Sequence, residues 1–289
     1  MLHGIHSFSA ALQGDVTIYS MTWDSHLEHL REVLNRLRNA GLTVNTSKCQ
    51  FALRRLQILG HILDVEKGQI LPSDDKIRAI QDFKRPLNKS QLKAWLGLTG
   101  YYRHMIKGYA EIVWCLTELL RKNMPDKLKW SEVHEQAFLK LKDHMTSSPI
   151  LVAPNPKKDY IPQCDATQTT VAGILSQLDD QGQERVVAYA SRKLLPRERN
   201  YPTIQRELLA ICWCLEHWDQ YVYGKHVDVF SDHRPLAWLQ SLAQHSSRLA
   251  RWIILLQKYD ISTTFRRGIE NQNADGLSRL ETVVAPPSE

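Results

Sequence analysis

The sequence predicts a mixed α/β fold, because its second half contains three successive strand patterns followed by alternating helices and strands. Strands show as short runs of apolar residues bounded by turn residues, and helices show as apolar residues recurring every three or four positions. The predicted strands are residues 159–164, 171–177, 185–190, 226–230 and 261–266. The predicted helices are residues 201–221, 235–239, 248–259 and 273–280.

The first half begins with one helix and a hairpin. Four leucines recur at helical spacing over residues 24–39 and predict a helix that Gly41 ends. A short strand is expected at residues 42–45. Strand patterns at residues 58–63 and 69–71 flank a Glu-Lys-Gly turn and predict a hairpin.

From residue 73 to about residue 150 the pattern is helical. Ser73 is a candidate N-cap, and Asn88 with Gln91 three residues later forms a capping box. The Pro-containing stretch of residues 147–156 then marks a domain boundary. The predicted helices are residues 73–83, 91–105, 112–121 and 131–145.

Length and composition exclude several classes of protein. The chain has 289 residues, 43% hydrophobic and 24% charged, which is ordinary for a folded globular protein and suggests two domains. No apolar run approaches the ~18 residues that a membrane span needs. The N-terminus lacks the pattern of a secretory signal. The five cysteines, odd in number and irregularly spaced, indicate reduced thiols in a cytosolic or nuclear protein.

The net charge of +6 lies mainly in residues 1–156 and is spread over helices. Such a surface suits a polyanion, although a mildly basic protein is also common without that role. The acidic residues of the second half are more specific, because four of them fall at predicted element ends or on the rim of an apolar helix stripe. They are Asp165, Glu207, Asp232 and Asp275.

Carboxylates at the ends of parallel strands meet at the edge where open α/β sheets bind ligands. Several carboxylates there would repel one another, and a divalent cation removes that conflict. An all-oxygen set suits Mg²⁺ or Mn²⁺, and two such ions would clamp the attacking and leaving oxygens of a phosphodiester. Individually, Asp165 and Asp232 also fit turn residues, Glu207 a solvated helix residue and Asp275 a helix cap.

From Asp24 onward nearly the whole chain resembles the reverse transcriptase–ribonuclease H region of Pol polyproteins from gypsy-type long-terminal-repeat retrotransposons. Many ordered segments carry this resemblance, which makes it highly specific. Among them are His26-Leu-Glu-His-Leu-Arg-Glu-Val-Leu34, Leu59-Gly-His61, Leu96-Gly-Leu-Thr-Gly-Tyr-Tyr-Arg103, Ala188-Tyr-Ala-Ser-Arg-Lys193, Ser231-Asp-His-Arg-Pro-Leu236 and Ala274-Asp-Gly-Leu-Ser-Arg279.

The resemblance implies a ribonuclease H-like mixed five-stranded sheet with helices, preceded by a truncated palm remnant and a helical thumb-like region. The implied domains are residues 1–72 (palm remnant), 73–150 (thumb or connection), 157–280 (ribonuclease H) and 281–289 (disordered tail). The family's Asp-Glu-Asp-Asp tetrad falls on the same four carboxylates. It implies two Mg²⁺ ions and cleavage of the RNA strand of an RNA–DNA hybrid, with 2′-hydroxyls giving discrimination. His233 is a candidate for proton transfer or a structural histidine.

The polymerase part departs from the family pattern. Where a Tyr-x-Asp-Asp motif is expected, Asp15 matches the second carboxylate but Gly14 replaces the first. One carboxylate cannot hold two ions, so we predict no DNA synthesis by this chain alone.

Basic residues in both halves are candidates for phosphate contacts, with a solvated surface as the alternative for each. They are Arg54, Arg55, Lys84, Arg85, Lys89, Lys93, Arg103, Lys107, Arg192, Lys193, Arg248 and Arg251. Three functions stay open: an endoribonuclease on hybrid or another nucleic acid duplex, a non-catalytic nucleic-acid-binding protein, and a fragment of a longer polyprotein that has polymerase activity. The retained tetrad favours the first, and the oligomeric state is not defined by the sequence.

Overall fold

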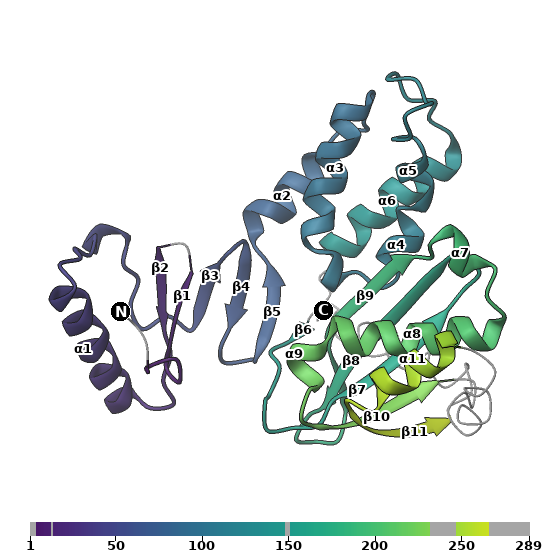
Figure 1. Cartoon of the computed structure of the whole chain (residues 1–289). Helices are drawn as coiled ribbons and strands as arrows, with labels where there is room; N and C mark the ends of the chain where they lie inside the picture. Colours follow the sequence, from purple (N-terminus) through teal and green to yellow (C-terminus); the bar gives the residue numbers. More distant parts are fainter. Residues whose placement is uncertain (1–3, 13, 148–150, 232–246, 266–289) are drawn as a thin grey trace, which may run out of the picture. The chain divides into compact units, whose positions relative to one another are not determined.

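The computed structural model describes residues 4–12, 14–147, 151–231 and 247–265 (Figure 1). The chain divides into two compact units, Met1–Leu53 and Arg54–Glu289. None of the helices in the described ranges is long and apolar enough to cross a bilayer. The mixed α/β class predicted from the sequence is confirmed.

The first unit is a small hairpin with one helix. Strands β1 (Ser9–Leu12) and β2 (Asp15–Ile18) pair antiparallel, and α1 (Trp23–Asn39) follows. The helix predicted from the four leucines is confirmed, and the side chain of Thr22 caps its start. The strand expected at residues 42–45 is wrong. This stretch is mostly exposed and has no strand partner, and its last residue, Asn45, instead caps a short 3₁₀ turn.

The second unit begins with a small sheet in the order β3-β4-β5-β6. Residues 58–63, predicted as one strand, are instead split by a turn. Leu59 and Gly60 both have positive φ (48° and 74°), so the chain reverses there and creates a strand that the sequence analysis did not resolve. The strands are β3 (Arg55–Ile58), β4 (His61–Asp64), β5 (Gln69–Pro72) and β6 (Leu151–Val152).

Between β5 and β6 lies a helical region that packs around Trp95 and Phe138. As predicted, Asn88 caps its longest early helix by accepting a hydrogen bond from the Gln91 amide at 2.9 Å. The helix predicted at residues 112–121 is in fact two short helices that meet at Val113. The helices are α2 (Asp74–Asp82), α3 (Lys89–Tyr101), α4 (Tyr109–Ile112), α5 (Trp114–Glu118) and α6 (Glu132–Thr146).

The largest element is a mixed sheet of five strands in the order β11-β10-β7-β8-β9. Strands β7, β8 and β9 run antiparallel, whereas β10 is parallel to both of its neighbours. The strands are β7 (Ile161–Ala166), β8 (Thr170–Leu178), β9 (Glu184–Lys193), β10 (His226–Ser231) and β11 (Asp260–Phe265). The helices are α7 (Pro196–Arg199), α8 (Thr203–His217), α9 (Asp219–Val222) and α11 (Ser247–Leu256).

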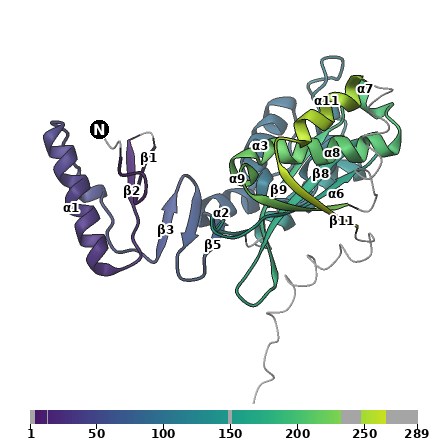
Figure 2. The same ribbon diagram turned by 60° about the horizontal axis from the view of Figure 1, so that its bottom comes forward.

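Helices cover both faces of this sheet. Helices α8 and α11 lie together on one face, as Figures 1 and 2 show, and α8 packs on β7 and β8. On β9 the side chains divide between two cores. Val187 and Ala190 join the core under α8, while Val186 and Tyr189 pack against the helical region. The helical region therefore covers the second face at β9.

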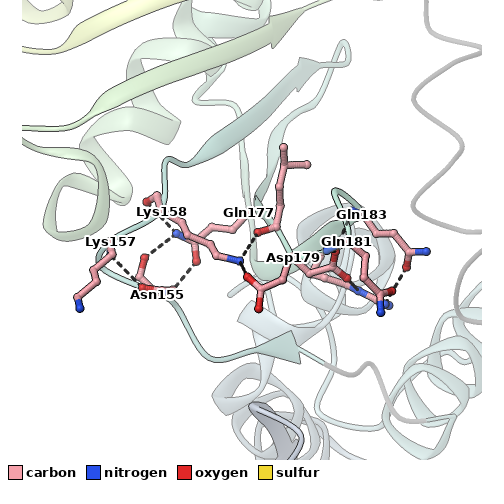
Figure 3. Close-up of polar contacts among 10 residues, drawn as sticks. Asn155, Lys157, Lys158, Gln177, Asp179, Gln181 and Gln183 are labelled. Carbon is pink, nitrogen blue, oxygen red and sulfur yellow. Dashed lines mark hydrogen bonds and ion pairs between the residues drawn. The ribbon is translucent and has the colours of Figure 1, made fainter.

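The segment that enters the large sheet is held by one buried glutamine (Figure 3). The side chain of Gln177 accepts a hydrogen bond from the Asn155 amide at 2.8 Å and donates to the carbonyls of Asn155 and Lys158. Beside it, Asp179 accepts from the amides of Gln181 and Gln183 and shapes the turn between β8 and β9. These contacts fix residues 155–158 against the end of the sheet.

Candidate nuclease site

Asp165 lies at the C-terminal end of β7, the central strand of the five-stranded sheet. The four residues before it are buried, and Asp165 itself is exposed. Since β7 and β10 run parallel, their C-terminal ends meet at the same edge of the sheet. The carboxylate therefore reaches solvent at the edge where open α/β sheets bind ligands.

Glu207 comes from α8, and its side chain is only 3% exposed. The distance between α8 and the sheet depends on Gly173 of β8. A Cβ atom at this glycine would lie 2.5 Å from Cys214 Sγ and 2.9 Å from the Trp218 ring. Because Gly173 has no side chain, the helix packs directly on the sheet and carries Glu207 down to it.

Cys164 lies near both carboxylates, because Asp165 follows it in β7 and the charge of Glu207 reaches it from α8. Contact with Cys214, burial, and the nearby charges of Glu207 and Asp165 together raise the pKa of this thiol well above its usual range. Both carboxylates thus act on the same buried sulfur. A thiol with a raised pKa stays protonated, so Cys164 is a packing residue and not a nucleophile. All five cysteines are free.

The other three predicted members of the site, Asp232, His233 and Asp275, lie outside the described residues. Strand β10 ends at Ser231, directly before the first of them in the sequence. Within the described ranges, no three His, Cys, Asp or Glu side chains lie close enough together to hold a metal ion. Of the predicted site, the structure describes two carboxylates, Asp165 and Glu207, and carboxylate oxygens suit hard divalent cations such as Mg²⁺.

Three of the four basic candidates in the second half make contacts inside the protein. Arg192 forms a bidentate pair with a buried glutamate, at 2.6 and 3.2 Å. The guanidinium of Arg248 stacks 3.9 Å above the Tyr201 ring. Lys193 packs on an indole ring of the helical region. The fourth, Arg251, is exposed, and its one hydrogen bond within the described residues is to a backbone carbonyl of its own helix.

The basic candidates of the first half also differ in their surroundings. Arg54 pairs with Glu66 at 2.6 Å, and Arg55 lies 3.5 Å from Asp64. Three other side chains contact carbonyls or an aromatic ring, namely Arg85, Lys89 and Arg103. The remaining candidates are exposed lysines, namely Lys84, Lys93 and Lys107.

The polymerase-like motif forms the turn of the β1–β2 hairpin. Asp15 opens β2 and is exposed. Gly14, at the position of the first family carboxylate, has φ of +97°. That conformation favours glycine over any residue with a side chain, so an aspartate would be strained in this backbone.

A pocket of about 460 Å³ opens beside the start of α8, one turn before Glu207. It is lined by two arginines that the sequence analysis did not single out, Arg199 and Arg206. Among the described residues, neither has a carboxylate within 4.0 Å. In the sequence the two arginines only flank the Tyr-Pro-Thr start of the helix, which is no specific signal for a site. The other lining residues are Gln168, Thr169, Tyr201, Pro202 and Thr203.

Residues 155–259 match the RNase H-like domain found in reverse transcriptase. The chain is also similar to the Pol polyprotein of transposon 297 from Drosophila melanogaster, with 34% identity over 270 residues, 92% of this chain and 24% of that protein. Similarity to the Tf2-3 polyprotein of Schizosaccharomyces pombe is 30% over 276 residues, 94% of this chain and 20% of that protein. The chain thus spans about a quarter of the polyproteins it matches.

Two solved structures share the fold. One is the foamy viral protease-reverse transcriptase in complex with an RNA/DNA hybrid, with a TM-score of 0.77 and 19% identity over 97% of this chain and 37% of that chain. The other is the same type of protein in complex with dsDNA, with a TM-score of 0.76 and 19% identity over 90% of this chain and 55% of that chain. At this identity the likeness concerns the fold alone.

Proposed function

Because this chain carries the RNase H-like domain found in reverse transcriptase and is similar over most of its length to gypsy-type retrotransposon Pol polyproteins, we propose that it hydrolyses the RNA strand of RNA–DNA hybrids. The observation that supports this most directly is that two carboxylates act on Cys164 near the end of the central strand: its neighbour Asp165, and Glu207 from α8. A carboxylate pair at this edge fits phosphodiester hydrolysis with divalent cations.

In this proposal Asp165 and Glu207 hold the ions together with Asp232 and Asp275. Bound Mg²⁺ or Mn²⁺ would supply an activated water and neutralise charge on the leaving oxygen. The four carboxylates would orient the ions relative to the bound phosphodiester. The tight packing of α8 on Gly173 keeps Glu207 at a fixed distance from the sheet. His233 would assist proton transfer near Asp232.

The pocket beside α8 would take a backbone phosphate of the duplex. Arg199 and Arg206 offer guanidinium groups with no carboxylate partner in the described part of the chain, which suits a phosphate. The exposed lysines of the helical region and Arg251 would add contacts that do not depend on base sequence. Contacts to 2′-hydroxyls would distinguish the RNA strand.

We further propose that the chain alone does not synthesise DNA. Asp15 is a single carboxylate, and the backbone at Gly14 disfavours a second one. Incubation with a primed template and dNTPs tests this directly. Incorporation above background would contradict the proposal.

Cleavage of a labelled RNA–DNA hybrid by the purified full chain with Mg²⁺ tests the nuclease proposal. We expect cutting by the wild type and a loss of more than about 100-fold in Glu207→Gln, since even outer-sphere partners of a metal site typically contribute 10–100-fold. Glu216→Gln is the matched control, because Glu216 is an exposed glutamate on the same helix.

The outcomes separate the alternatives. Equal cleavage by wild type and Glu207→Gln would overturn the assignment of the site. Tight hybrid binding without cutting by the wild type would favour a non-catalytic nucleic-acid-binding protein instead.

A further inference from the structure

The indole ring of Trp114, in α5 of the helical region, contacts two cations that belong to the RNase H-like domain. Lys193 Nζ is 4.1 Å from the centre of its indole ring, and Arg199 Cζ is 4.6 Å from it. One cation comes from the end of β9 and the other from α7. An indole ring attracts cations placed over its face.

The position of Trp114 is well fixed by contacts between its segment and β9. The Ala110 amide donates to Ser191 Oγ at 2.9 Å, and Arg103 donates to the Ser191 carbonyl at 3.3 Å. Lys193 Nζ donates to the carbonyl of Trp114 at 3.3 Å and also to the hydroxyl of Thr117. The backbone that carries the ring is thus held against β9 by several hydrogen bonds.

Arg199 stands at the end of a short helix that is itself anchored. Glu198 accepts a bidentate pair from Arg192 and a further hydrogen bond from the Leu195 amide at 2.8 Å. This fixes the backbone before Arg199, while the Arg199 side chain remains exposed. The position of the Arg199 guanidinium at the pocket therefore depends on the groups that restrict its side chain.

An exposed arginine normally samples many rotamers, and ordering it on binding costs free energy. Contact of the guanidinium with the Trp114 ring, at 4.6 Å from Cζ to the ring centre, restricts those rotamers before a ligand arrives. The N–H groups at the edge of the guanidinium stay available for the pocket, where Arg206 offers a second set.

We propose that Trp114 is a positioning residue for hybrid binding: it holds Arg199 at the phosphate pocket, so the helical region contributes to substrate affinity of the RNase H-like domain. This rests on the proposed function, with a backbone phosphate of the hybrid as the bound group. Trp114 itself contacts no substrate and acts through Arg199.

Steady-state cleavage of hybrid by the full chain tests the proposal in Trp114→Leu and Trp114→Phe. We expect Trp114→Leu to raise KM by about 2- to 5-fold at unchanged kcat, the range that corresponds to one exposed cation–π contact. Trp114→Phe should retain most of the wild-type KM, because it keeps an aromatic face. Trp23→Leu is the control, since it removes an exposed indole of the first unit and should leave KM unchanged.

A double variant shows whether the effect passes through Arg199. In an Arg199→Ala background, Trp114→Leu should cause no further rise in KM. The proposal is overturned if Trp114→Leu leaves KM unchanged, if it lowers kcat and thermal stability instead, or if its full effect persists without Arg199. Loss of cleavage and of hybrid binding in the wild type would instead reject the proposed function, so the two failures are distinguishable.

Discussion

A long amphipathic helix of the first unit, α1, and one of the second unit, α8, are buried very differently. In α1 of the first unit, Leu27 is 43% and Leu34 is 39% exposed. In α8 of the second unit, Leu208 and Leu215 are 1% and 0% exposed. The two helices have similar lengths, 17 and 15 residues. An apolar stripe therefore predicts that a helix forms, but not how completely its face is covered.

The difference extends to the cores. The first unit has a core built on Ile5 and Val33, and its sheet is a two-stranded hairpin. The RNase H-like domain packs a large cluster between α8 and a five-stranded sheet. Hairpins of two strands are marginal by themselves, whereas a covered sheet holds its residues rigidly. A chemical site that needs fixed carboxylates is therefore better supported in the second unit.

The largest expected effect comes from a matched pair of leucines. Leu215→Ala should lower the free energy of unfolding by about 2–5 kcal/mol, because it leaves a cavity in a closed core. Leu27→Ala should cost less than about 1 kcal/mol, because the side chain is already partly in water. Urea unfolding followed by circular dichroism measures both. Similar losses would mean that the face of α1 is covered in solution and would break the comparison.

A smaller effect is expected from a pair of glycines. Gly173→Ala should destabilise the chain by about 1–3 kcal/mol and reduce hybrid cleavage, because the new Cβ displaces α8 and Glu207 with it. Gly97→Ala is the control. Gly97 lies within α3, where an added Cβ meets no atom within 4 Å, and alanine should stabilise the helix by about 0.5–1 kcal/mol. Wild-type stability of Gly173→Ala would contradict the close packing of α8.

The smallest expected effect is a loss of stability at low pH, caused by His104 of the second unit. Burial, then the neighbouring His61 and Arg103, lower the pKa of His104 to about 4. The unfolded chain takes up a proton near pH 6.5 and the folded chain only near pH 4, so stability is lost as pH falls through this window. We expect a loss of about 1–2 kcal/mol, allowing for partial exposure. Unfolding at pH 7 and pH 4.5 measures it.

The control for the acid response is His104→Phe, which keeps a ring beside His61 but cannot be protonated. It should flatten the dependence of unfolding free energy on pH. An unchanged slope in this variant would assign the acid response to other groups.

Local signals in the sequence were sufficient for much of the fold. The cap at Asn88 and the long helix containing Glu207 both depend on residues close in sequence, and both were predicted. The turn at Leu59 and Gly60 was missed, because apolar residues continue through it and only the positive φ angles reveal it.

The candidate site was likewise predicted from the sequence only in part. Asp165 and Glu207 could be selected because each occupies a recognisable place on a strand end or a helix rim. The pocket arginines could not, because their role depends on α7, α8 and Trp114 meeting in space. Gly173 could not be selected either, because its role in the packing of α8 depends on contacts with Cys214 and Trp218, more than forty residues away.

The hydrogen bonds between Gln177 and residues 155–158 affect where the protein can be truncated. Gln177 is 3% exposed, and its amide uses both of its polar atoms on residues 155 and 158. In a fragment that starts after residue 158, this amide would be buried without these hydrogen-bond partners, which would lower the free energy of unfolding by about 1–3 kcal/mol. An isolated fragment of the RNase H-like domain should therefore begin ahead of Asn155, so that the peptide groups that bind Gln177 are retained.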